Sequence, residues 1–255
     1  MHIPIIFSFA RSGGTLVNQL LGVHPDCLIL SEVNPAASVV TVARQAADWL
    51  GLIKEAEVEQ FQKLFYSQQI SLLVERAKSK DKTLIIRDWV TANYLPDVGG
   101  NFVVPSYILE QSVYLARAGY SLKPLVVTRK ASDVYRSVRR SFIQLANLSA
   151  EDFSLSYLAY ARAVQAFPRV SLEALQSAPN ETLIQILRDF ELYTNCLDMQ
   201  LETFADFRRC TGNNTLTMPS ATTHLRHIAT VKSDSLINMD TEAFTEADCL
   251  MGYEV

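Results

Sequence analysis

The sequence predicts an α/β fold in which helices cover both faces of a parallel β-sheet. Short apolar runs alternate along the chain with longer segments of helical periodicity. Two of these runs, residues 3–9 and 124–128, lead into a polar turn and then into a helical pattern. The 255 residues, of which 49% are hydrophobic and 20% charged, suffice for one core, so we expect a single domain over 1–255.

The elements are expected in an alternating order, followed by a mostly helical second half. Up to residue 150 they are a strand at 3–9, a helix at 14–22, a helical insertion at 36–79 with patterns at 36–50 and 55–79, a strand at 82–89, a helix near 106–118, a strand at 124–128 and a helix at 132–146. Beyond it, a helix is expected at 153–167 and a short strand with helices within 168–192. The tail, 211–255, is rich in Thr, Ser and Asn and is expected to be loop-like.

The segment FSFARSGGTLVNQLL, residues 7–21, joins an apolar run to an amphipathic helix through a turn of small residues. Paired glycines let a backbone turn sharply and approach a ligand closely. The helix that follows directs unpaired N–H groups and the positive end of its dipole at the same place. A guanidinium and hydroxyl groups add donors for an oxyanion. The sequence therefore predicts an anion-binding cradle formed by Arg11, Ser12, Gly13, Gly14 and Thr15.

The cradle departs from the triphosphate-binding loop GxxxxGK(S/T), since Ser8 and Gly14 stand where that motif needs glycine and lysine. Its RSGGT core resembles the 5′-phosphosulfate loop of sulfotransferases, usually (P/A)(K/R)SGTT. Gly14 replaces the first threonine, which removes one hydroxyl donor. The resemblance implies a P-loop-NTPase-like three-layer sandwich with a central parallel sheet, and 3′-phosphoadenylyl sulfate (PAPS) as sulfuryl donor. An ordinary strand, glycine turn and helix is the alternative.

The segment HPDCLILSE, residues 24–32, follows the first helix at a spacing that resembles the tyrosylprotein branch of sulfotransferases. In that branch a carboxylate after the HP pair acts as general base, and the matching residue here is Glu32. A base is needed because an acceptor hydroxyl is a poor nucleophile until its proton leaves. A surface glutamate in a loop is the alternative reading of this residue.

A second candidate for the general base is Asp88, at the end of the strand expected over 82–89. Enzymes with an α/β fold place catalytic groups at the carboxyl ends of such strands. Some sulfotransferases have a histidine base after the corresponding strand. The neighbouring Arg87 is expected either to pair with Asp88 or to help hold the acceptor.

The segment KPLVVTRKASDVYRSVRRSF, residues 123–142, resembles the sulfotransferase element RxPxDxxxS, with Ala131 where proline is common. The resemblance implies that Arg129 and Ser137 bind the 3′-phosphate of PAPS, the group that distinguishes PAPS from ATP. Residues 129–140 hold five basic side chains and one acid, whereas the whole chain has a formal net charge of −4. The positive charge is therefore local; a solvated basic helix face is the alternative.

Together these elements predict in-line transfer of a sulfuryl group from PAPS to a hydroxyl or amine of an acceptor, either a small molecule or a peptide. Glu32, or failing it Asp88, removes the acceptor proton, while Arg11 and the cradle stabilise the charge on the departing oxygen. No metal is expected, since no His, Cys or Asp cluster has the spacing of a metal site. A P-loop nucleotide or small-molecule kinase and a nonenzymatic nucleotide-binding module are the alternatives.

The composition argues against several other classes of protein. The mild negative charge provides no broad positive surface for nucleic acid or membranes. No apolar run approaches the roughly 20 residues of a membrane span, and the first ten residues lack the basic start of a signal peptide. The four cysteines form no CxxC pair, which is typical of reduced thiols. We therefore expect a cytoplasmic enzyme.

Overall fold

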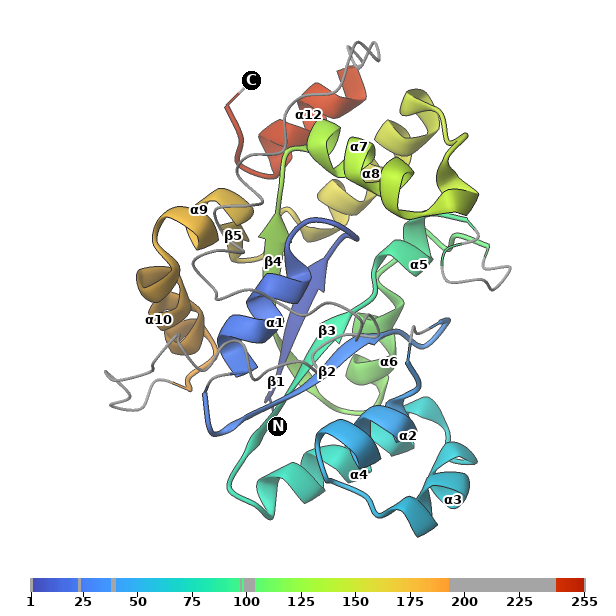
Figure 1. Ribbon diagram of the computed structural model, residues 1–255, viewed down its shortest axis with the longest axis vertical. Coiled ribbons are helices and arrows are strands. Elements are labelled where there is room, and N and C mark those ends of the chain that lie inside the picture. Colours follow the sequence, from blue (N-terminus) through green and yellow to red (C-terminus); the bar gives the residue numbers. More distant parts are fainter. Residues whose placement is uncertain are drawn as a thin grey trace.

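The computed structural model describes residues 2–22, 24–37, 40–96, 98, 104–192 and 242–254. Its centre is a five-stranded sheet, and every pair of neighbouring strands in it is parallel (Figure 1). In the order in which they lie across the sheet, the strands are β2 (Cys27–Val33), β3 (Thr83–Asp88), β1 (His2–Ser8), β4 (Ser121–Thr128) and β5 (Arg169–Ser171). The predicted parallel α/β architecture is confirmed.

Helices cover both faces of the sheet. One face carries α1 (Gly14–Gly22), α9 (Leu172–Ser177) and α10 (Pro179–Asp189). The other face carries α4 (Tyr66–Lys78), α6 (Glu110–Arg117) and α8 (Ala150–Val164), and α12 (Glu242–Leu250) packs against α8 and α7. Shorter or flanking helices are α2 (Val42–Arg44), the π-helix η1 (Gln45–Trp49), the 3₁₀ turn η2 (Glu55–Glu57), α3 (Val58–Gln62), α5 (Thr91–Tyr94), α7 (Ala131–Ser141) and the 3₁₀ turn η4 (Ile143–Leu145).

The central strand β1 explains why the molecule has two cores. Its residues Ile5, Ile6 and Phe7 are all fully buried. Because side chains alternate along a strand, Ile5 and Phe7 pack into the core under α4, α6, α8 and α12, whereas Ile6 packs into the core under α1, α9 and α10. A strand buried on both faces needs a continuous apolar run, and IPIIF in the sequence is such a run.

The structure differs from the sequence-based expectations in three places. Strand β2 was not expected, although its residues CLILSEV are largely apolar. The helical pattern expected at 55–79 divides into η2, α3 and α4, and the pattern expected at 36–50 is helical over Val42–Trp49, as α2 and η1. The expectation of a loop-like tail is wrong for Glu242–Leu250, because these residues form α12. Phe244 of that helix is buried against Tyr135 and Phe153, so the helix belongs to the core.

The carboxyl ends of the strands meet at one edge of the sheet, where β1 lies between β3 and β4. The predicted cradle follows β1 directly, Arg129 follows β4, and Asp88 ends β3. Glu32 lies near the end of β2. Ligands of parallel α/β sheets bind at this edge, so the fold brings the predicted site residues to the expected place.

Candidate active site

The cradle (residues 11–15) is a tight turn between β1 and α1. The Ser12 N–H donates to the Phe9 carbonyl at 3.1 Å. Gly13 has a φ of 102°, and a Cβ at this position would lie 2.8 Å from Leu172 Cδ1. Conformation and space therefore both favour glycine there. The first amides of α1 have no acceptors within the helix, so the turn offers backbone donors to an anion.

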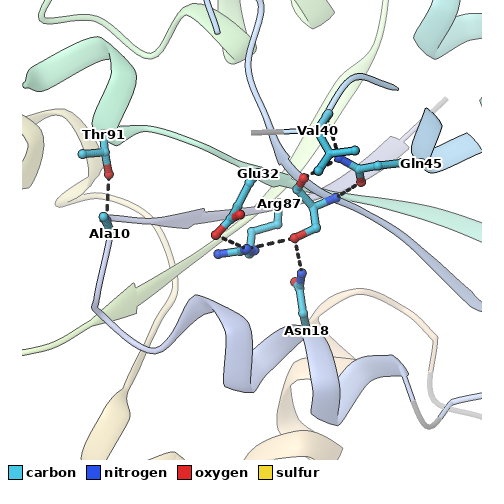
Figure 2. Close-up of polar contacts among 8 residues, drawn as sticks. Ala10, Asn18, Glu32, Val40, Gln45, Arg87 and Thr91 are labelled. Atoms are coloured by element: carbon cyan, nitrogen blue, oxygen red, sulfur yellow. Dashed lines mark hydrogen bonds and ion pairs between the residues drawn. The ribbon is translucent and has the colours of Figure 1, made fainter. Parts of the chain in front are cut away.

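Two contacts fix the residues that lead into the cradle. The Ala10 N–H donates to Thr91 Oγ1 of α5 at 2.7 Å (Figure 2). The ring of Phe9 packs against Tyr157 and Tyr160 of α8, with centroid distances of 5.0 and 5.4 Å. The cradle is thus held from two helices, and its amides need little rearrangement to bind a ligand.

The second predicted anion-binding element lies directly against the cradle. Arg11 Nε donates to Ser137 Oγ of α7 at 3.0 Å, and Arg129 Nη1 donates to the Arg11 carbonyl at 3.1 Å. The Arg129 carbonyl in turn accepts from the Tyr157 hydroxyl at 3.0 Å. The cradle and the segment that contains Arg129 and Ser137, more than a hundred residues apart in the sequence, therefore form one hydrogen-bonded network.

Positive charge is concentrated around Arg11. Its pKa is lowered, first because the surrounding protein desolvates the guanidinium and then because Arg129 and Arg140 place like charges nearby. The carboxylate of Glu32 opposes these effects. A bound anion would relieve the repulsion between the three arginines, so the electrostatics favour a negatively charged ligand at this place.

Glu32 lies in a β-bulge. Ser31 pairs with Arg87 and Val33 pairs with Asp88, so Glu32 is the extra residue between two regular pairs of β2 and β3. Its φ of 54° is left-handed, which is uncommon for a residue other than glycine. Bulges of this kind re-aim side chains and are frequent beside active sites. The Glu32 side chain is one-fifth exposed, and Oε1 lies 2.8 Å from Arg87 Nη2 (Figure 2).

Arg87 pairs with Glu32, and the expected pairing with Asp88 is wrong. Neighbouring residues of a strand point to opposite faces, so Arg87 points toward α1 while Asp88 points toward the core under α8. Arg87 Nη2 also donates to Ser31 Oγ at 2.9 Å, and that hydroxyl accepts from Asn18 Nδ2 of α1 at 2.9 Å (Figure 2). The bulge is thereby connected to α1.

Asp88, the second candidate base, is fully buried. Its Oδ1 accepts from Asn34 Nδ2 at 2.8 Å, and the same amide group donates to Asn93 Oδ1 at 2.7 Å. Burial raises the pKa of Asp88 to about 8, although the hydrogen bond from Asn34 lowers it. Asn34 and Asn93 were not predicted from the sequence. For Asn34 the available signal was its position directly after the apolar segment that forms β2.

Comparisons with known proteins show which solved structures have a similar fold. No protein-family model and no curated protein matches the chain. Among solved structures, the chain is similar to the sulfotransferase domain of the Synechococcus PCC 7002 olefin synthase, with a TM-score of 0.62 and 15% identity over 100% of this chain and 96% of that one. The chain therefore shares the fold of this sulfotransferase domain. The sulfotransferase domain from the curacin biosynthetic pathway is equally similar (0.62, 15%), with 98% of its length covered.

Within this sulfotransferase-like fold, two further observations concern the described residues. No three His, Cys, Asp or Glu side chains of the described segments come together as a metal site. None of the helices that the structure describes is long and apolar enough to cross a membrane.

The raised pKa of Asp88 predicts a pH-dependent stability. Between the ordinary value of 3.8 and about 8, the folded protein holds a proton that the unfolded chain has lost, so the free energy of unfolding falls as pH rises through this window. The Asp88→Asn variant lacks this proton. Its stability relative to the wild type should therefore increase with pH, by up to about 1.4 kcal/mol per pH unit.

Urea denaturation at a series of pH values measures this difference. Glu181→Gln, which removes one negative charge from an exposed position on α10, is the control. A difference between Asp88→Asn and the wild type that does not change with pH would contradict the raised pKa.

Proposed function

We propose that this protein is a sulfotransferase that moves a sulfuryl group from PAPS to a hydroxyl or amine of an acceptor. The observation that carries the proposal is the contact between two anion-binding elements, made by the Arg11–Ser137 and Arg129–Arg11 hydrogen bonds. Two adjoining groups of donors suit a nucleotide with phosphates at both its 5′ and 3′ positions. The likeness in fold to two structures titled as sulfotransferase domains supports the proposal.

In the proposed complex, the cradle holds the 5′-phosphosulfate. Arg11 and Thr15 provide side-chain donors, while Gly13 and Gly14 allow the backbone amides to approach the oxyanion. Ser12, predicted from the sequence as a third donor, is fully buried, so its side chain is not given a contact with the donor. Arg129 and Ser137 bind the 3′-phosphate and orient the nucleotide. Arg11 also stabilises the charge that grows on the departing oxygen. A preorganised donor of this type is worth about 3 kcal/mol in the transition state.

The proposed reaction is an in-line displacement. The acceptor oxygen or nitrogen attacks sulfur, and the bond between sulfur and the 5′-phosphate oxygen breaks as adenosine 3′,5′-bisphosphate leaves. Glu32 receives the proton of the acceptor. The proposal uses no metal ion, since the cradle, Arg11 and Arg129 provide the positive charge.

Glu32 is the preferred base for a geometric reason. Its carboxylate is partly exposed at the carboxyl edge of the sheet, and its charge acts on Arg11 of the cradle. Asp88 remains the second candidate, because its raised pKa suits a base that works near neutral pH. Its complete burial and its bond to Asn34 favour a structural role instead.

The remaining expectations stay predictions from the sequence. They are an acceptor that is a small molecule or a peptide, no nucleic-acid partner, no membrane association and a cytoplasmic location. The kinase and the nonenzymatic binding module remain the competing functions, and ligand binding separates them.

The donor proposal predicts selective binding of adenosine 3′,5′-bisphosphate. In thermal-shift titrations the bisphosphate should stabilise the fold more than adenosine 5′-phosphate, ADP or Mg·ATP. A ligand at 100 times its Kd contributes about 2.7 kcal/mol. Arg129→Ala should weaken binding of the bisphosphate but not of adenosine 5′-phosphate, because only the former has a 3′-phosphate.

Arg162→Ala is the matched control, since Arg162 pairs with Glu246 of α12 and belongs to neither anion-binding element. A response to Mg·ATP alone would favour the kinase. No response to any of the four ligands would contradict a nucleotide site in the cradle.

The base assignment predicts unequal effects of two matched substitutions. Glu32→Gln should lower kcat by about 10²- to 10⁴-fold, because the amide cannot accept the acceptor proton. It should leave binding of adenosine 3′,5′-bisphosphate intact or improved, because a negative charge near Arg11 is removed. Asp88→Asn should retain most activity.

Both variants are assayed by release of adenosine 3′,5′-bisphosphate from PAPS with a panel of phenols, alcohols and amines. Loss of activity in Asp88→Asn alone would transfer the role of base to Asp88. Turnover unaffected by either substitution would rule out both carboxylates.

A further inference from the structure

A buried arginine lies directly beneath the cradle. Arg87 is 5% exposed, and its Nη2 contacts Glu32 Oε1 at 2.8 Å and Ser31 Oγ at 2.9 Å. A Cβ added to Gly14 would lie 2.7 Å from Arg87 Nη1 and 2.3 Å from Ser8 Oγ. The guanidinium therefore extends into the space that the side chain of residue 14 would occupy.

Hydrogen bonds to Gln45 hold the backbone next to Glu32. The Ser31 N–H donates to Gln45 Oε1 at 2.6 Å, and Gln45 Nε2 donates to the Ser31 carbonyl at 2.7 Å (Figure 2). This pair of hydrogen bonds holds the backbone just before the bulge. The left-handed conformation of Glu32 costs on the order of 1–3 kcal/mol, so the rest of the structure must hold it in place.

Stability alone does not account for a cation at the position of Arg87. The N-terminus of α1 is the positive end of the helix dipole, so a buried guanidinium beside Gly14 is unfavourable there. Buried ion pairs are in general weak sources of stability compared with apolar residues of similar volume. The pair of Arg87 with Glu32 does, however, direct one carboxylate oxygen toward the cradle edge of the sheet.

We propose that Arg87 is a positioning residue, which holds the carboxylate of Glu32 beside the cradle, and that Gly14 lacks a side chain because Arg87 needs the space. This inference rests on the proposed function, in which Glu32 is the base. It explains why glycine stands where the sulfotransferase loop usually has threonine: the missing hydroxyl donor leaves room for the guanidinium that aligns the base. The cradle and the base are therefore one coupled unit.

The test uses Arg87→Lys, Gly14→Ala and the double variant, each assayed for kcat and for the KM of PAPS. Lysine keeps the charge but cannot reproduce the planar fork. The Cβ of an alanine at residue 14 would lie too close to both Arg87 Nη1 and Ser8 Oγ, so at least the guanidinium or the hydroxyl must move. Each single variant should lose kcat on the order of 100-fold, as expected from a misplaced catalytic group. In Arg87→Lys, the KM of PAPS and the thermal shift by adenosine 3′,5′-bisphosphate should stay close to the wild-type values, because Arg87 is not part of the cradle.

The double variant shows whether the two substitutions reduce kcat through the same contact or through independent effects. If both substitutions act through the same contact, Gly14→Ala should cost little more once Arg87 is lysine. Arg76→Lys is the control. Arg76 of α4 also pairs with a glutamate, Glu57 of η2, but neither residue belongs to the cradle or to a strand of the sheet. Its kcat should be unchanged.

Three outcomes would overturn the inference. They are a wild-type kcat in Arg87→Lys, additive losses in the double variant, or a raised KM of PAPS with unchanged kcat in Arg87→Lys. If Gly14→Ala shows no cooperative melting transition, the split between kcat and KM in Arg87→Lys decides alone. Failure of the proposed function has a different signature, since the wild type itself would then neither bind adenosine 3′,5′-bisphosphate nor turn over PAPS.

Discussion

The candidate site depends on how closely the rest of the chain approaches the turn between β1 and α1. Arg129 and Ser137 contact Arg11 from the β4–α7 side. Thr91 holds the residue before the cradle, and Arg87 lies against Gly14 from below. Residues of β3, α5, α7 and the turn after β4 thus meet around residues 10–14. A side chain at Gly14 would collide with Arg87 and Ser8, and one at Gly13 would collide with Leu172, so both small residues are needed for this packing.

The same convergence gathers charge in one place. Desolvation lowers the pKa of Arg11, and the like charges of Arg129 and Arg140 lower it further, in a chain whose net charge is negative. Glu32 is the nearby carboxylate that offsets this charge, and it also neutralises Arg87. One glutamate therefore offsets two groups of cations, Arg11 with its neighbours and Arg87, which leaves the site with an excess of positive charge that favours an anionic ligand.

Much of the fold and part of the site could be predicted from the sequence. The glycine turn after an apolar run identified the cradle, and the basic segment after 124–128 identified its partner, because both signals are local. Other features depend on tertiary structure. Strand β2 was not predicted, because the segment CLILSEV was interpreted only through its glutamate. Helix α12 was not predicted, because it depends on the packing of Phe244 against Phe153.

The partner of Arg87 could not be predicted for a similar reason. Asp88 is its neighbour in the sequence, but alternation along β3 separates the two side chains, and a bulge in a different strand brings Glu32 to Arg87 instead. The role of Gly14 is also nonlocal, since the atoms that exclude a side chain there belong to Ser8 and Arg87. Sequence spacing identified these residues but not their contacts.

The most direct measurement is a crystal structure of the protein with adenosine 3′,5′-bisphosphate. The account predicts the 5′-phosphate within hydrogen-bond distance of the cradle amides, and the 3′-phosphate on Arg129 and Ser137. The Glu32 carboxylate should face the open side of the 5′-phosphate, where a sulfuryl group would lie. A nucleotide bound away from the cradle, or with its two phosphates exchanged, would contradict the central claim.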